Sequence, residues 1–271
     1  MQKIYTVDSF TRRPFAGNPA GVCPLAAPAP EDWMRRVASE MNLSETAFFY
    51  PAGDGYDLRW FTPVAEVDLC GHATLAAAHI LWSERLSAAD RLVFSTRSGK
   101  LGATRDGDLI ELDLPAAPVN PCDTPEGLLE ALGVEALYVG RYGPGAQGDF
   151  LIEVTDREAL LALNPDFTAL KRIPARGILI TASGAGSDYD FFSRFFAPAF
   201  GIDEDPVTGS AHCASGPYWA KKFARSDLRA FQDSRRGGEV ELTVAGERVA
   251  LRGAAVTIMR GEIIAPDQSG L

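Results

Sequence analysis

The sequence repeats itself, and this repeat limits the fold more than any other feature. The apolar and aromatic segment at 59–63, Arg-Trp-Phe-Thr-Pro, returns at 194–198 as Arg-Phe-Phe-Ala-Pro. Further on, Cys-Gly-His-Ala at 70–73 matches Thr-Gly-Ser-Ala at 208–211, and an alanine-rich helical pattern follows each. Each helical pattern leads into a strand and a hairpin, with the expected turns at Asp106-Gly107 and Ala245-Gly246. The chain is therefore expected to contain two halves built alike.

The 271 residues suit two domains of about 130 residues each. Three prolines within 115–121 can neither continue a helix nor pair in a central strand, so we place the linker there. The first expected half is 1–118, with its central helix at about 73–85. The second is 119–271, with its central helix at about 211–223 and a last strand that crosses back to the first half.

Each half reads as several strands around one largely buried helix, which is the α+β class. An outer helix is expected over 31–41, where Met34, Val37, Ala38 and Met41 fall on one face. Inside the second central helix, Pro217 lacks a backbone donor, and we expect a kink there.

The net charge of −10 argues against nucleic acid or an anionic membrane as a partner, because both require a basic surface. No apolar run approaches the roughly 18 to 20 residues of a membrane span, and no signal-peptide core follows Met1, so a cytoplasmic protein is expected. The four cysteines form no CxxC pair, which favours free thiols over disulfides or zinc. They are Cys23, Cys70, Cys122 and Cys213.

Each central helix begins directly after a glycine, at Gly71 and at Gly209. The first amides of a helix are unpaired and carry the positive end of its dipole, so they bind anions. If the two halves face each other, these amides converge on one cleft suited to a substrate carboxylate or an enolate-like oxygen. The simpler alternative is that Asp68 and Thr208 cap the helices, and the paired occurrence makes the cleft the better interpretation.

Five segments of the chain, in order, resemble the phenazine-biosynthesis (PhzF-like) family. They are Val-Asp-Ser-Phe-Thr at 7–11, Pro-Phe-Ala-Gly-Asn-Pro-Ala at 14–20, Asn-Leu-Ser-Glu-Thr-Ala-Phe-Phe at 42–49, Gly-His-Ala-Thr at 71–74 and Glu-Asp-Pro-Val-Thr-Gly-Ser-Ala at 204–211. The resemblance implies the diaminopimelate-epimerase-like fold, in which each pseudo-symmetric half wraps a barrel-like sheet around a central helix. It also implies a homodimeric isomerase that needs no cofactor and acts on a small carboxylate.

Glu45 stands at the entrance to an apolar stretch, where the ionised form of a carboxylate is disfavoured, as a general base near neutral pH requires. A solvated strand end is the commoner role of a glutamate at such a position. By resemblance to the family, Glu45 is the residue that removes a proton from one carbon and returns it to another. Its neighbour Ser44 is expected to bind substrate.

The resemblance also assigns site positions to His72, Asp205 and Ser210. His72 is expected to shuttle a proton or hydrogen-bond the substrate, and Asp205 to orient it, although Asp205 could equally serve the helix entry. Ser210, with the backbone of Gly71 and Gly209, is expected to bind substrate.

A metal site at Cys70, His72 and His79 is disfavoured, because the two histidines, seven residues apart, are separated by two helical turns, unlike the i, i+4 pair of a helical zinc site. Cysteine-based racemisation needs two opposed thiols, and Thr208 stands where the second would be. A dehydratase or racemase using Cys70 alone stays open, as does a non-catalytic protein that binds a small carboxylate. The expected reaction is a proton shift by Glu45 that moves a double bond.

Overall fold

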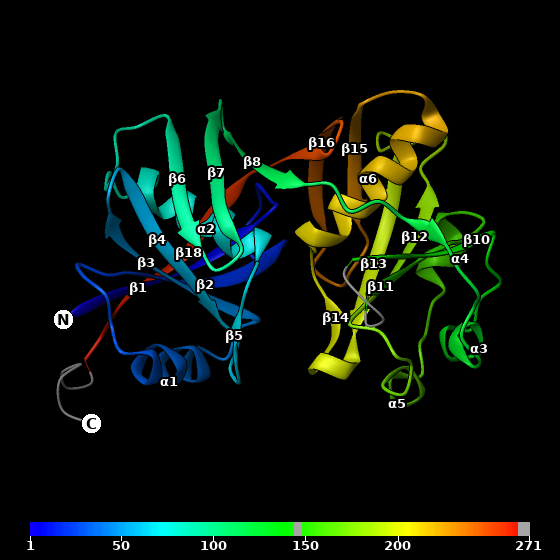
Figure 1. Cartoon of the computed structure of the whole chain (residues 1–271), viewed down its shortest axis with the longest axis horizontal. Coiled ribbons are helices and arrows are strands. Elements are labelled where there is room, and N and C mark those ends of the chain that lie inside the picture. The colour runs from blue at the N-terminus through cyan, green and yellow to red at the C-terminus, as the bar shows by residue number, and fades with distance from the viewer. Residues whose placement is uncertain (144–147, 265–271) are drawn as a thin grey trace. The chain divides into compact units, whose positions relative to one another are not determined.

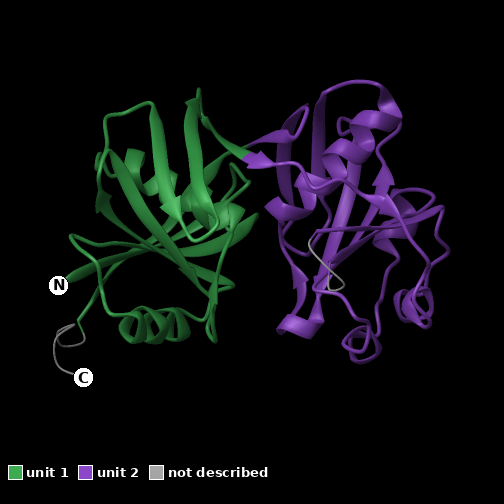
Figure 2. Ribbon diagram, viewed as in Figure 1, with its two compact units in different colours: residues 1–113, 252–271 green, residues 114–251 purple. Residues whose placement is uncertain are grey.

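A computed structural model describes residues 1–143 and 148–264. Helices and strands alternate irregularly along this chain, which makes it an α+β protein as expected (Figure 1). The chain divides into two compact units, described here one at a time (Figure 2). Unit 1 contains residues 1–113 and 252–271, and unit 2 contains residues 114–251.

Unit 1 is built mainly from strands, with one outer and one central helix. Its elements are β1 (Gln2–Ser9), β2 (Asn18–Pro24), α1 (Glu31–Met41), β3 (Glu45–Ala52), β4 (Gly55–Phe61), β5 (Glu66–Val67), α2 (Gly71–Ser83), β6 (Arg91–Thr96), β7 (Gly99–Asp106), most of β8 (Leu109–Pro115), and β18 (Ala255–Ile263). The outer helix α1 has the predicted bounds and buries Met34 and Ala38.

Unit 2 adds short helices to a similar framework. Its elements are β9 (Asn120–Pro121), α3 (Leu128–Leu132), β10 (Tyr138–Tyr142), β11 (Asp149–Glu153), α4 (Arg157–Leu161), α5 (Phe167–Leu170), β12 (Ile178–Ser183), β13 (Phe191–Ala197), the 3-10 turn η2 (Pro198–Phe200), β14 (Ile202–Asp205), α6 (Gly209–Phe223), β15 (Asp227–Gln232), β16 (Gly238–Ala245) and most of β17 (Arg248–Gly253). Within the described residues, no helix is both long and apolar enough to cross a membrane.

The sequence repeat corresponds to one strand order used twice. In unit 1, β1 runs antiparallel to β2, β2 parallel to β3, β3 antiparallel to β4, and β4 parallel to β6. In unit 2, β10, β11, β12, β13 and β15 follow the same sequence of directions. The predicted turn glycines, Gly107 and Gly246, adopt φ of 63° and 60° in the matching hairpins.

The repeat also extends to one set of side-chain contacts. Arg59 bonds to Glu66 through Nε at 2.7 Å and lies over the ring of Phe61, with Cζ 5.1 Å from its centroid. In unit 2, Arg194 donates from Nε to Glu204 at 2.7 Å in the same way. The Cζ atom of Arg194 lies 5.0 Å from the centroid of the Phe196 ring. The two units therefore use the same device to hold the strand that precedes the central helix.

Both central helices begin two residues earlier than predicted, at Gly71 and Gly209 instead of 73 and 211. The glycines were expected to precede the helices, yet they form the first turn. Helix α2 is buried along most of its length and packs on β1, β2, β3 and β18, while α6 packs on β15 and β16.

Helix α6 continues through Pro217, where a kink was predicted. Proline removes the amide that would bond to the carbonyl of Cys213. The amide of Ala117, from the linker, donates to that carbonyl at 2.9 Å instead. A distant segment therefore satisfies the group that the proline leaves without its usual partner.

The linker belongs to unit 2, since Ala116 also donates to the carbonyl of Glu247 at 2.9 Å. The division between the units accordingly falls at Asp113 and Leu114, a few residues before the expected one at 118. The second chain segment of unit 1 begins at Arg252. Its strand β18 pairs with β1 along the whole length of β1.

Candidate active site

Glu45 is the first residue of β3, where it pairs in parallel register with Ala20 of β2. Its side chain is 14% exposed, so the alternative of a solvated strand end is not observed. The neighbouring Ser44 is half-buried just before the strand. The carboxylate is thus sheltered but within reach of a small molecule.

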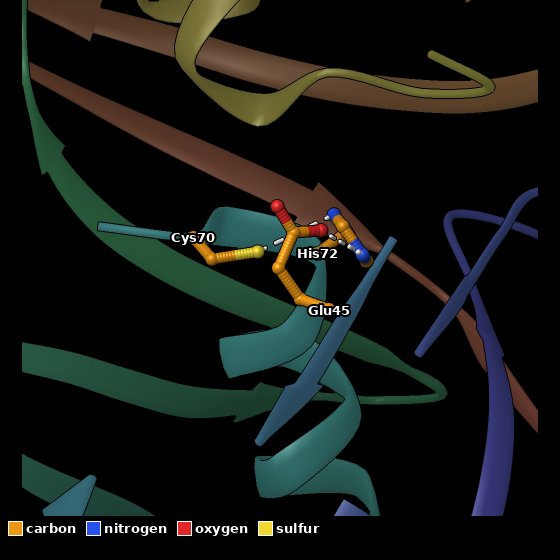
Figure 3. Close-up of side chains that lie close together, drawn as sticks. All are labelled: Glu45, Cys70 and His72. Atoms are coloured by element: carbon orange, nitrogen blue, oxygen red, sulfur yellow. Dashed lines mark hydrogen bonds and ion pairs between the residues drawn. The ribbon is translucent and has the colours of Figure 1, made fainter. Parts of the chain in front are cut away.

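His72 lies in the first turn of α2, and its imidazole faces Glu45 (Figure 3). Its Nε2 is 3.4 Å from Glu45 Oε2, while its Nδ1 is 3.2 Å from Nδ2 of Asn18. Because the Asn18 amide nitrogen faces Nδ1, Nδ1 accepts and the ring proton is on Nε2. Burial lowers the pKa of His72 to about 3, so the ring is neutral at physiological pH.

Cys70 is the N-cap residue of α2 and points its sulfur at the same imidazole (Figure 3). Its Sγ is 3.5 Å from His72 Nδ1. No side chain caps this helix, so the alternative that Asp68 caps it is wrong. The first amides of α2 therefore face the site without a side-chain oxygen across them. His79, the other histidine weighed for a metal, contacts Oγ1 of Thr257 at 3.0 Å instead.

The matching helix entry of unit 2 has a different set of side chains. Thr208 is the N-cap residue of α6, but its hydroxyl donates to the carboxylate of Asp205 and does not cap the helix. Gln232 fixes this turn, because its Nε2 donates to the carbonyl of Asp205 at 2.7 Å and its Oε1 accepts from the Thr208 amide at 2.8 Å. The side chain of Thr208 therefore does not have the capping role considered for it.

Arg176, which the sequence analysis missed, lies beside Ser210 at this second helix entry. Its Nη2 is 3.5 Å from Ser210 Oγ, and its Nε donates at 3.0 Å to Asp149, a carboxylate only 2% exposed. The Arg176 side chain as a whole is 48% exposed. Asp149 opens β11 and Arg176 lies shortly before β12, so the pairing of these two strands brings the two side chains together. No motif of the sequence indicated this pair.

Of the predicted site residues, the structure brings Glu45 and His72 together with Cys70 and places Gly71 at the helix entry beside them. Asp205, Gly209 and Ser210 lie around the start of α6 in unit 2. That the two groups serve one substrate stays a prediction from the repeat.

Cys23, Cys213 and His212 are buried in states that do not suit them to catalysis. Burial raises the pKa of Cys23 and of Cys213 to about 12 and lowers that of His212 to about 4. The His212 Nδ1 is 2.8 Å from the carbonyl of Thr208, within its own helix. All four cysteines are free, as predicted.

Comparisons with known proteins give a consistent result over nearly the whole chain. The family model described as phenazine biosynthesis-like protein matches residues 7–261. An uncharacterized isomerase of Halalkalibacterium halodurans is 50% identical over 96% of this chain and 98% of its own. The phenazine biosynthesis-like domain-containing protein 2 of Mus musculus is 41% identical over 97% and 99% of the two chains.

Solved structures show the same relationship. A PhzF-family phenazine biosynthesis protein of Enterococcus faecalis is 39% identical and superposes with a TM-score of 0.92, over 97% of this chain and 99% of its own. A probable proline racemase from Agrobacterium radiobacter has a TM-score of 0.68 at 13% identity, over 99% and 94% of the chains. The second comparison shows a shared fold alone.

Proposed function

Because the chain belongs to the phenazine biosynthesis-like (PhzC-PhzF) family and is an isomerase, we propose that it shifts a double bond by moving a proton with Glu45. The observation that carries this proposal is the sheltered carboxylate of Glu45, 3.4 Å from the neutral imidazole of His72. The substrate class is a small carboxylic acid that bears an amino or hydroxy group and a ring or conjugated double bond.

The carboxylate of Glu45 takes a proton from an acidic carbon of the substrate and becomes a carboxylic acid. The electron pair of the broken C–H bond moves into the conjugated system, and the double bond shifts. Glu45 then returns the same proton to a second carbon, so the substrate keeps its composition. A single base accounts for both steps when the two carbons lie on one face of the ligand.

The neutral state of His72 supports this assignment. An imidazole with a pKa of about 3 cannot compete with Glu45 for the proton near neutral pH. Its Nε2 lies 3.4 Å from the carboxylate without hydrogen-bond geometry, and a rotation of the ring would let the N–H stabilise the anion without giving up its proton. We assign His72 to positioning and polarisation.

Arg176 supports the choice of a carboxylic acid as substrate. Asp149 uses Nε and Nη2 of the guanidinium, while Nη1 has no other partner within the described part of the chain. The guanidinium of a half-exposed arginine beside an uncapped helix start is suited to bind a carboxylate. Asp205, held by Thr208 and Gln232, is expected to orient the substrate through its amino group.

Solvent deuterium exchange tests the proposal. Wild-type protein is incubated in D₂O with cyclic and conjugated amino and hydroxy acids, and mass spectrometry follows both isomerisation and label. Glu45→Gln should lower exchange at least about 1,000-fold with the fold unchanged. Glu40→Gln, an exposed carboxylate on α1, is the matched control. Full exchange in Glu45→Gln would contradict the proposal.

Cys70 favours a second candidate, a single-thiol racemase or dehydratase, because its sulfur stands at a helix start 3.5 Å from an imidazole nitrogen. Exchange that depends on Cys70 and not on Glu45 would identify it. Binding without exchange would identify the third candidate, a non-catalytic carboxylate receptor.

We also expect activity without a cofactor, from a homodimer. Turnover that survives dialysis against a chelator checks the first expectation. Light scattering of the eluted protein checks the second.

A further inference from the structure

A thiol, an imidazole and a carboxylate from three parts of unit 1 meet within the reach of one metal ion (Figure 3). One ligand atom each from Glu45, Cys70 and His72 lies within 4.8 Å of the others. We propose that these three side chains bind a single divalent cation of the zinc class, and that the bound ion inhibits the enzyme by occupying Glu45. The inhibition rests on the proposed function of Glu45, whereas the binding does not.

The Nε2 atom of His72 gives the strongest reason for this site. The residue is only 4% exposed, and Nε2 makes no hydrogen bond to any described residue. Its approach to Glu45 Oε2 lacks the geometry of a hydrogen bond although the atoms are 3.4 Å apart. A buried nitrogen that faces a carboxylate without a hydrogen bond is a ready metal ligand.

The spacing of the ligand atoms agrees with zinc. A tetrahedral ion with bonds of about 2.1 Å to nitrogen and oxygen keeps these two ligand atoms about 3.4 Å apart. The observed Nε2–Oε2 distance is 3.4 Å. Sulfur would lie about 3.6 Å from the nitrogen. The remaining adjustment is a movement of Cys70 Sγ from the Nδ1 side of the ring toward Nε2, by rotation about its Cα–Cβ bond.

The protons and charges of the bound state balance. The thiol of Cys70 loses its proton to solvent, and the ring proton of His72 moves from Nε2 to Nδ1. The side chain of Asn18, which faces Nδ1 at 3.2 Å, then turns its oxygen toward that N–H. One thiolate and one carboxylate neutralise the two charges of the ion, as a sheltered site requires. The fourth position stays open for water.

The corresponding positions of unit 2 could not bind such an ion. Thr208 replaces the thiol, Ser210 replaces the imidazole, and Gly177, with Arg176 just before it, stands at the place of Glu45. A hydroxyl pair beside a guanidinium offers no soft ligand and repels a cation. The proposal therefore predicts one ion per chain.

Titration of the chelator-treated, full-length protein with Co²⁺ and Zn²⁺ tests the site without substrate. Wild-type protein should show a thiolate-to-cobalt charge-transfer band in the near ultraviolet, and calorimetry should show one Zn²⁺ per chain. Cys70→Ser should abolish the band and weaken Zn²⁺ binding about 100-fold, and Glu45→Gln should also weaken binding. Circular dichroism checks that both variants are folded.

Two variants outside the cluster serve as controls. Cys122→Ser removes a half-buried thiol, and His79→Gln removes the histidine that contacts Thr257, so both should bind Zn²⁺ like the wild type. A wild-type protein without the cobalt band, or unchanged affinity in Cys70→Ser, would overturn the proposal. If Zn²⁺ binds while Glu45→Gln still exchanges deuterium, the metal site stands and the proposed reaction fails. If exchange needs Glu45 but no Zn²⁺ binds, the metal site alone fails.

Discussion

His72 presents its two ring nitrogens to different partners, with Nε2 3.4 Å from Glu45 and Nδ1 3.2 Å from Asn18. His72 can therefore have two roles, polarisation of Glu45 through Nε2 and packing against Asn18 through Nδ1. Replacing the whole imidazole would remove both. The amide nitrogen of glutamine reaches the place of Nε2, and the amide of asparagine reaches the place of Nδ1. Polarisation of Glu45 can therefore be measured apart from packing against Asn18.

We expect His72→Gln to keep more of kcat than His72→Asn, by about tenfold, because only glutamine retains a donor facing Glu45. The acidic limb of the kcat/KM profile should move to higher pH in His72→Asn, since a carboxylate that loses a donor is protonated more easily. Steady-state rates between pH 5 and pH 8 check both statements. Equal rates in the two variants would assign His72 to packing alone.

The buried histidines should make the protein less stable in weak acid. The pKa of His72 is lowered to about 3 and that of His212 to about 4, so below pH 6.5 the unfolded chain binds protons that the folded chain does not. The free energy of unfolding should then fall by about 1.4 kcal/mol for each group between pH 7.5 and pH 5.5. Urea unfolding at the two pH values measures the loss.

His212→Asn isolates one of these contributions, because asparagine can still donate to the Thr208 carbonyl that lies 2.8 Å from Nδ1. This variant should lose about 1.4 kcal/mol less stability than the wild type over the same pH range. An identical pH dependence would show that His212 does not contribute.

Cys70→Ala should keep deuterium exchange within about tenfold of the wild type if Glu45 is the base. Iodoacetamide labelling followed by peptide mass spectrometry measures how readily the thiol reacts. A loss of exchange as large as that of Glu45→Gln would favour the thiol mechanism.

Arg176→Ala should raise KM at least about tenfold and lower kcat little, because the guanidinium is proposed to bind a carboxylate that does not react. Benzoate, used as a probe, should bind the wild type and lose affinity in the variant, whereas benzamide should show no such difference. Arg172→Ala removes an exposed cation a few residues away and should leave both constants unchanged. A kcat effect without a KM effect would contradict the assignment.

Gly21 lies beside Thr46, the residue that follows the proposed base, on the paired strands β2 and β3. A Cβ at position 21 would stand 2.6 Å from Oγ1 of Thr46, which no side chain could occupy without displacement. Gly21→Ala should therefore cost about 1–3 kcal/mol of stability and lower kcat as β3 moves.

A double-mutant cycle assigns that cost to the contact. Thr46→Ala removes the obstructing atoms, so Gly21→Ala should be much less costly in the Thr46→Ala background. Costs that simply add would show that Gly21 is needed for another reason.

Sequence patterns correctly predicted the features that depend on residues close together in the chain. The outer helix α1 has its predicted bounds, since its apolar spacing and the preceding Pro30 act within a few residues. The repeat of Arg59 and Arg194 indicated two similar halves, and the α+β class followed from it. Glu45 and His72 were found through the family motifs.

What could not be predicted depends on partners distant in the sequence. Helix α6 tolerates Pro217 because Ala117 supplies the missing donor, and no local rule could indicate that contact. Arg176 belongs to no motif, and its contact with Asp149 depends on the pairing of β12 with β11. The side chain of Thr208 does not cap α6, because its hydroxyl donates to Asp205 in a turn that the distant Gln232 holds through the Thr208 amide.

Strand β18 pairs with all of β1, so the first and the last strands of the described chain are neighbours. A ribosome therefore releases every residue of unit 2 before it makes the partner of β1. Until then β1 has one vacant edge, and helix α2 lacks part of its cover. The half that contains Glu45 is thus the first to be translated and the last to be completed.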